Sequence, residues 1–372
     1  MRLAWRNLSH DRLRFAVTVI GIVFAVFLMV FQGSLLVGFI NAASRLIDAS
    51  DADIWIVARG VPCFEYPAPL PQRFRELAQG VPGVAAVSRV VVGATSWQSP
   101  SGGRQLVVLV GAEAGAGRDF PLPRLHADGE TMLPEAVLID QSNAATLESA
   151  VTPVEVEINR RRARVERAVT GFGSFLGSPY VFAAYADAVN YLGLGSEETM
   201  YLLVRTAPGY EVETVRRDLQ ARLPEADVWT RNGFASRSRT FWLDQTGSGG
   251  AISLAGLLGF LVGLVVVSQT IYSTTMDHLE EFATLKAIGA SGRYVLGVVL
   301  TQALASGVAG SIIGIAVTIP LLRLARRGIA WIYTPWWLLA GMVLVSLVMC
   351  GLASLISIRK AVTVEPGRVF RA

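Results

Sequence analysis

The chain has 372 residues, of which 52% are hydrophobic and 17% are charged, and its mean hydropathy is +0.46. Soluble globular domains carry about 25% charged residues, so this composition excludes an ordinary soluble protein. The formal net charge of +4 is unevenly distributed: residues 41–245 hold 20 Lys+Arg and 24 Asp+Glu, whereas the remainder holds 13 basic and 5 acidic residues. Because the positive charge flanks apolar segments, it indicates a membrane protein with cationic cytoplasmic loops and argues against nucleic-acid binding.

Four stretches of the chain carry no charged side chain: 15–44, 245–276, 294–322 and 328–358. Each is longer than the ~20 apolar residues that cross a bilayer core, where backbone groups must be satisfied within a helix. We therefore predict transmembrane helices at 15–40, 247–272, 294–320 and 335–358. The Arg-rich start also fits a cleavable signal peptide, but the first apolar run exceeds the ~7–15-residue core of such signals, which favours a retained span.

The orientation follows from the basic residues, which are retained on the cytoplasmic side. With both termini inside, ten basic residues fall in the cytoplasmic segments 1–14, 273–293 and 359–372. Three fall in the short outside loop 321–334, namely Arg323, Arg326 and Arg327. These three lie beside Trp and Tyr residues typical of the membrane interface and are candidates for lipid contact. We predict a multi-pass inner-membrane protein with residues 41–245 outside the cytoplasm.

Residues 41–245 are predicted to form a mixed α/β domain. Segments rich in β-branched residues and bounded by Gly or Pro predict strands at 53–57, 89–92, 106–110, 136–139 and 201–204. Two further segments, 154–158 and 163–169, predict a hairpin with its turn at 159–162. Its three consecutive arginines fit a solvated hairpin tip better than an anion site. Helices are predicted at 72–79 and 211–222.

The sequence carries no motif for catalysis or nucleotide binding. The pattern G-x-x-x-x-G-K-[ST] is missing, and the chain has only two lysines, Lys286 and Lys360. The predicted spans contain no Asp, Glu, Lys or Arg that could relay ions or protons. The two cysteines, Cys63 and Cys350, have no neighbouring ligand that would suggest a metal. We expect a non-catalytic chain with no cofactor or metal of its own, so its energy source must be external.

The loop 273–293 carries the most informative pattern. Apolar residues recur at every third position: Leu279, Phe282, Leu285 and Ile288. This spacing predicts a short helix with an apolar ridge, in which acidic residues precede Lys286 and Gly289 suits the C-terminal end. Such a helix could dock into a groove of a cytoplasmic partner or simply connect two spans along the membrane surface.

Residues 281–290, Glu-Phe-Ala-Thr-Leu-Lys-Ala-Ile-Gly-Ala, resemble the cytoplasmic motif of FtsX/MacB-type ABC transporter permeases, which is roughly R-E-x-[AG]-x-L-[RK]-A-[IM]-G. Glu280 departs from this motif, because the family has a basic residue there. Residues 51–60 and the tail 359–371 are similar to the DevC-like subgroup, whose permease is a separate subunit. The order of one span, a large domain and three spans also agrees with the family.

The resemblance implies the permease subunit of an ATP-binding cassette exporter, with four transmembrane helices and a large mixed α/β extracytoplasmic (periplasmic) MacB-like domain between helices 1 and 2. It implies an ATPase-coupling role for seven residues: Leu279, Glu281, Phe282, Leu285, Lys286, Ile288 and Gly289. Since no ATPase domain precedes the first span, a separate ATPase would bind MgATP and drive the movement. Further expected partners are a second protomer in a homodimer, a periplasmic adaptor and an outer-membrane channel.

Two alternative functions remain within this resemblance. One is release of lipoproteins, as in LolC/LolE-like permeases, and the other is FtsX-like regulation of cell-wall hydrolases. The cargo itself is not evident from the sequence.

Small residues form two tracks along predicted spans: Gly256, Gly259 and Gly263, and Ser306, Gly310 and Gly314. Such tracks allow helices to approach closely in lipid. The contacts could form between protomers or within one chain.

Overall fold

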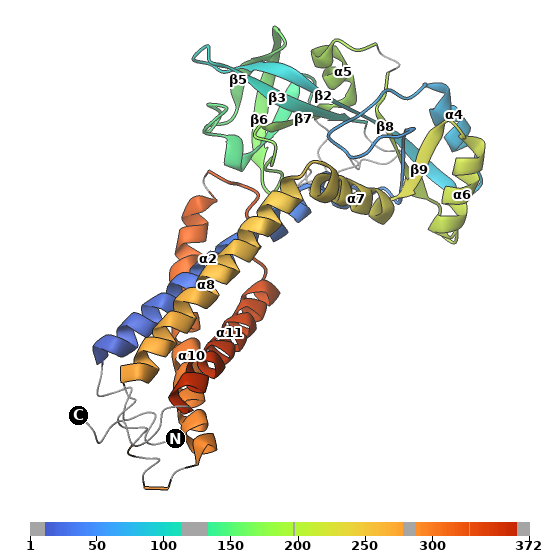
Figure 1. The fold of residues 1–372 in the computed structure, drawn as a ribbon. Helices are drawn as coiled ribbons and strands as arrows, with labels where there is room; N and C mark the ends of the chain where they lie inside the picture. Colours follow the sequence, from blue (N-terminus) through green and yellow to red (C-terminus); the bar gives the residue numbers. More distant parts are fainter. Residues whose placement is uncertain are drawn as a thin grey trace. The chain divides into compact units, whose positions relative to one another are not determined.

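A computed structural model describes residues 12–113, 133–195, 198–277, 284, 288–289, 291–326 and 328–362. The chain divides into two compact units, which are described separately. The helical unit comprises residues 1–38, 250–328 and 332–372, and the α/β domain comprises residues 39–249 and 329–331. Figure 1 shows both units in the colours of the sequence.

The described part of the helical unit contains four helices that are long and apolar enough to cross a membrane. They are α2 (Arg12–Ala42), α8 (Ser248–Asp277), α10 (Gly292–Ala325) and α11 (Trp336–Val362). Helix α10 continues past the predicted boundary at 320, so that Arg323 lies in its last turn and Arg326 is its C-cap, while Arg327 lies outside the described residues. With the α/β domain inserted between α2 and α8, this arrangement confirms the predicted fold class.

The described residues of the α/β domain form one nine-stranded sheet in the order β3-β7-β4-β6-β5-β2-β8-β1-β9, with an additional pairing of β3 and β2. Its strands are β1 (Ile54–Ala58), β2 (Val84–Gln98), β3 (Arg104–Ala112), β4 (Ala136–Asp140), β5 (Val154–Ile158), β6 (Arg161–Val169), β7 (Tyr180–Ala184), β8 (Tyr201–Thr206) and β9 (Ala226–Thr230). The 15-residue strand β2 belongs to two halves of the domain.

The first half has the chain order β1-α4-β2-β8-α6-β9 and the spatial order β2-β8-β1-β9, with antiparallel pairing throughout. This is the ferredoxin-like arrangement of two split β-α-β units. Helices α4 (Arg73–Gln79) and α6 (Val212–Arg222) contribute to one core together with Ile54 and Ile56 of β1. Trp55 and Val57 belong to a second core, because successive strand residues point to opposite faces.

The second half is a six-stranded barrel inserted between β2 and β8. The C-terminal part of β2 pairs with β3 on one side and with β5 on the other, which closes the ring β2-β3-β7-β4-β6-β5. Trp97 and Val165 belong to its buried core. Helix α5 (Tyr185–Leu192) packs so closely on β3 that a Cβ on Gly111 would lie 2.1 Å from Cβ of Ala188, so this position requires glycine.

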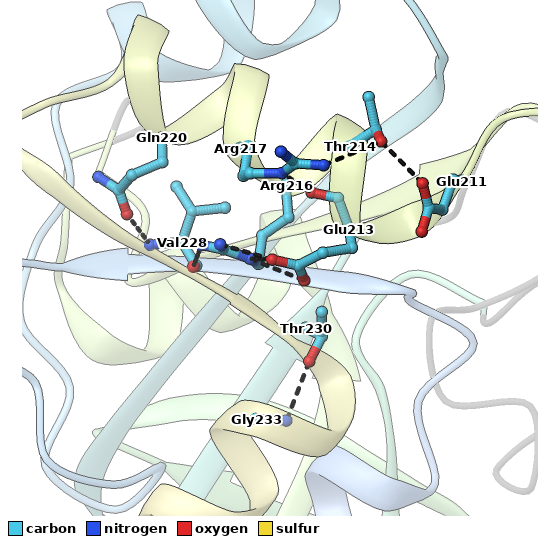
Figure 2. Close-up of polar contacts among 9 residues, drawn as sticks. All are labelled: Glu211, Glu213, Thr214, Arg216, Arg217, Gln220, Val228, Thr230 and Gly233. Carbon is cyan, nitrogen blue, oxygen red and sulfur yellow. Dashed lines mark hydrogen bonds and ion pairs between the residues drawn. The ribbon is translucent and has the colours of Figure 1, made fainter.

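Strand β9 lies at one edge of the sheet, and side chains of α6 satisfy its backbone groups. As Figure 2 shows, the Gln220 Oε1 accepts from the Val228 N–H at 3.0 Å. The Arg216 guanidinium donates to the Val228 carbonyl at 3.2 Å and is itself held by Glu213, one turn earlier, at 2.7 Å. These contacts block the pairing that an open edge strand would invite.

The structure differs from the sequence-based expectations in several elements. Strands β7 and β9 and helices α5 and α7 (Arg231–Thr240) were not predicted, and neither was the π-helical turn η3 (Phe241–Gln245). The hairpin turn is shorter than predicted, because Arg161 already pairs with Ile158. Only Asn159 and Arg160 remain in the turn, both with positive φ, as a two-residue type I′ hairpin requires.

Candidate functional site

The loop between α8 and α10 holds the residues predicted to couple to an ATPase. Leu279, Glu281, Phe282, Leu285 and Lys286 lie outside the described residues. Their coupling role stays a prediction.

Two predicted coupling residues of this loop are described. The Ile288 N–H donates to the Thr284 carbonyl at 3.1 Å, which closes one helical turn, and the Ile288 side chain is 80% exposed. Gly289 follows with a φ of +101°, a left-handed conformation suited to glycine at a helix end. The Ser291 hydroxyl then accepts from the Tyr294 N–H at 3.3 Å and caps α10.

Three of the predicted packing glycines lie against α2 of the same chain. A Cβ at Gly310 would lie 2.5 Å from Ile22 Cγ2, one at Gly314 3.0 Å from Val26, and one at Gly263 2.9 Å from Ala25 Cβ. Among the described atoms, the nearest to a Cβ at Gly256 or Gly259 would lie at 3.9 and 3.8 Å, respectively, and Ser306 is buried. Gly310 and Gly314 of α10 and the last glycine of the α8 track thus sit at close intrachain helix contacts.

The chain enters the α/β domain from α2 and leaves it into α8, and hydrogen bonds join these two connections. The buried Ser238 hydroxyl of α7 donates to the Ala43 carbonyl, just after α2, at 2.6 Å. The Arg239 guanidinium donates to the Ser44 hydroxyl at 2.8 Å and to the Asp48 carboxylate at 2.6 Å. Asp48 ends the short helix α3 (Arg45–Asp48). We call these contacts the clasp.

Aromatic rings extend from the clasp across the same end of the domain. The ring of Phe39, in the last turn of α2, packs edge-on against Phe175 at 5.3 Å and lies 6.1 Å from Trp331 in the α10–α11 connection. Phe175 in turn packs perpendicular to Trp242 of η3 at 5.0 Å. Tyr66 lies over Trp242 at 6.1 Å. We call these five residues the aromatic row, and it links the connections to all four long helices.

A half-buried carboxylate lies beside the aromatic row. Glu65 Oε2 accepts from Trp242 Nε1 at 2.9 Å, and Oε1 accepts from the Tyr180 hydroxyl at 3.3 Å. Desolvation raises the pKa of Glu65 above its ordinary value of 4.5, and these two hydrogen bonds offset part of that effect. Burial, with a contribution from the charge of Glu65, raises the pKa of the nearby Cys63 thiol to about 12. These groups hold neighbouring segments together and offer no reactive nucleophile.

Comparison with known proteins accounts for both units. A family model for the MacB-like periplasmic core domain matches residues 15–222, and one for the FtsX-like permease C-terminal region matches residues 253–366. The chain belongs to the FtsX/MacB-type ABC transporter permeases. This permease is therefore a multi-pass membrane protein of a transporter class that works with an ATPase.

Relatives of this permease align along almost the whole chain. An uncharacterized ABC transporter permease of Mycobacterium tuberculosis is 23% identical over 99% of this chain and 98% of its own length. A relative from Mycobacterium bovis with the same description is 21% identical, over 98% and 96%.

Two solved structures are similar to the α/β domain. The periplasmic region of MacB from Actinobacillus actinomycetemcomitans is 12% identical, with a TM-score of 0.36, over 50% of this chain and 92% of its own. The extracellular domain of the transporter YknZ from Gram-positive bacteria is 14% identical, with a TM-score of 0.35, over 48% and 99%. At these scores the family assignment rests on the two family models.

The clasp and the aromatic row were not predicted from the permease sequence. Arg239 and Asp48 are far apart in the chain, and nothing in their local pattern indicates that they pair. One usable signal was present: Phe241 and Trp242 directly precede the second long apolar segment, where aromatic residues often mark a membrane interface.

Proposed function

We propose that this permease transmits ATP-driven motion from a separate ATPase at the cytoplasmic face of the inner membrane to its α/β domain on the other side. Both termini would be cytoplasmic, and MgATP would bind only to the ATPase. A second copy of the permease would complete a homodimer. The α/β domain would act with a periplasmic adaptor, and through it an outer-membrane channel, in export.

The clasp is the observation that carries this proposal. It ties the segment after α2 to α7, and α7 leads through η3 and a short bend at Thr246 and Gly247 into α8. A movement of either helix would therefore act on one hydrogen-bonded segment instead of two independent linkers. Gly289 and the capped start of α10 support a compact turn after the predicted coupling helix. Such a helix can present its apolar ridge to a partner groove.

Co-purification tests the ATPase contact. The affinity-tagged permease, isolated from its native membrane, should retain a second protein with vanadate-sensitive ATPase activity. Leu285→Asp should abolish this association, because a charge would enter an apolar contact, whereas the isosteric control Leu285→Met should retain it. Full retention of the ATPase by Leu285→Asp, with normal membrane insertion, would refute the docking role of this residue.

Cysteine labelling tests the orientation. A cysteine replacing Val151, whose side chain is 82% exposed in the α/β domain, should react with a membrane-impermeant maleimide in spheroplasts. A cysteine replacing Ile288, which is similarly exposed, should react only after lysis. The reverse pattern would place the domain in the cytoplasm and overturn the proposal.

A further inference from the structure

The two halves of the α/β domain share β2, and two of their loops come together on the side opposite α4 and α6. The loop after β1 belongs to the ferredoxin-like half and carries Glu65 and Tyr66. The loop between β6 and β7 belongs to the barrel half and carries Phe175. Phe64 from the first loop and Phe182 from β7 belong to the same buried core. This region is the seam between the halves.

Trp242 contacts both sides of the seam. Its indole N–H donates to Glu65, and its ring lies over Tyr66, both in the ferredoxin-like half. The opposite half contributes Phe175, whose ring meets the indole at an interplanar angle of 90°. The side chain of Trp242 is only 6% exposed, so it fills the space where these loops meet.

A second path crosses the seam through Glu65. The carboxylate that accepts from Trp242 also accepts from Tyr180 at the start of β7 in the barrel half. Tyr180 is buried, so loss of this bond would leave its hydroxyl without that acceptor away from water. The hydrogen-bonded chain Trp242–Glu65–Tyr180 therefore fixes η3, one loop and one barrel strand relative to each other.

Trp242 lies close to the start of a membrane helix. It belongs to η3, a π-helical turn, and the bend at Thr246 and Gly247, with a φ of +71° at Gly247, separates η3 from α8. The Thr246 hydroxyl donates to the Trp242 carbonyl at 2.7 Å across this bend. A π-turn places more residues in a turn than an α-helix and often occurs at functional positions. Along the chain, η3 and the bend after it are the connection between α8 and the domain.

We infer that Trp242 is a wedge residue through which α8 sets the angle between the ferredoxin-like half and the barrel half. Displacement of the indole would act on Glu65 and Tyr66 on one side and on Phe175 on the other. The two halves would then pivot about their shared strand β2. The movement of α8 by ATP hydrolysis rests on the proposed function. The effect of Trp242 on the angle between the two halves depends on the α/β domain alone.

Distances between spin labels can measure that angle in the full-length permease in nanodiscs. One label would replace Asp218 on α6, and the other would replace Val151 in the barrel half, because both side chains are exposed. The native Cys63 is fully buried and Cys350 is also buried, so labelling would be confined to the introduced cysteines.

Three variants distinguish a specific effect of Trp242 on the angle between the halves from a general loss of stability. Trp242→Ala removes the wedge, and Trp242→Phe keeps a ring beside Phe175 but loses the bond to Glu65. Trp229→Phe is the matched control, because the Trp229 N–H has no hydrogen-bond partner among the described residues. Should Trp242→Ala fail to fold, Trp242→Phe still supplies the comparison.

The expected result without nucleotide is a single narrow distance distribution for the parent protein and for Trp229→Phe. Trp242→Phe should broaden it, and Trp242→Ala should broaden it further and shift its maximum. Distributions for both Trp242 variants that coincide with that of Trp229→Phe would overturn the inference.

A second measurement adds the ATPase and vanadate-trapped MgATP. The parent complex should change its label distance, and Trp242→Ala should hydrolyse ATP without that change. An unchanged distance in a parent complex that hydrolyses ATP would overturn the coupling through α8 while leaving the proposed function intact. Failure to recover any ATPase would overturn the proposed function, and the nucleotide-free distances would still decide the wedge.

Discussion

Replacing Gly310 with alanine should destabilise the helical unit, because the new methyl group has no space. Its Cβ would lie 2.5 Å from Cγ2 and 2.6 Å from Cβ of Ile22, well inside van der Waals contact. Ile22 is β-branched and fully buried, so its Cβ can move only if α2 or α10 moves. Overpacking of this kind typically costs about 1–3 kcal/mol.

The same helix offers a matched control. A Cβ at Gly297 of α10 would meet no described atom within 4 Å. There alanine should be neutral or stabilising by up to about 1 kcal/mol, because it is a better helix former than glycine. The two substitutions are chemically identical, so their difference isolates the contact with Ile22.

Thermal unfolding of the purified protein in one detergent would provide the measurement. Gly310→Ala should lower the unfolding midpoint by several degrees relative to Gly297→Ala. Combining it with Ile22→Ala should cost less than the sum of the two single changes, because the smaller residue makes room for the methyl group. Equal midpoints for the two glycine variants would refute the close contact between α2 and α10.

Three further predictions concern the α/β domain. Because burial raises the pKa of Glu65 above 4.5 in the folded protein, its contribution to stability is fully present below the unfolded pKa and is lost as the pH rises through the folded pKa. The difference in unfolding free energy between the wild-type protein and Glu65→Gln should therefore fall as the pH rises from about 4.5. Chemical denaturation at several pH values would measure this difference, and a value that does not change with pH would contradict the reasoning. Cys63, with its pKa raised to about 12, should resist maleimide at pH 7 until the protein is denatured, which mass spectrometry can check; labelling of the native protein would contradict its burial. Ser238→Ala should cost about 1–3 kcal/mol, since it leaves the Ala43 carbonyl without its buried donor, whereas Asp48→Asn should cost under about 1 kcal/mol because that ion pair is partly exposed. Denaturant titration of both variants should give this order, and the opposite order would refute it.

Local patterns were sufficient for much of the α/β domain. Strand β1 and helices α4 and α6 lie close to their predicted positions. In each, residues that favour the element form an uninterrupted run, and Gly or Pro follows shortly after its end. Strand β7 was missed although Val181 and Phe182 suit a strand. Its following helix α5 begins immediately after it, so no turn residue marks the boundary.

The candidate site was only partly accessible to sequence reasoning. The predicted packing positions Gly263, Gly310 and Gly314 fall at close helix contacts. Small residues in transmembrane helices often mark such contacts, because they allow two helices to approach closely. The sequence could not tell whether those contacts lie within one chain or between two. For Gly310, the contact with Ile22 is within the chain.

By itself the sequence determined the four membrane spans and the place of the inserted domain, because water exclusion imposes long uncharged helices whatever their partners. It also carried the motif at 281–290 that indicates the family. Only the tertiary structure decided that Trp242, Glu65 and Phe175 meet at one seam. These residues lie on segments far apart in the chain, and their contacts depend on the closure of the barrel and the pairing of β2 with both halves. No local sequence pattern predicts these contacts, because they depend on the packing of the whole domain.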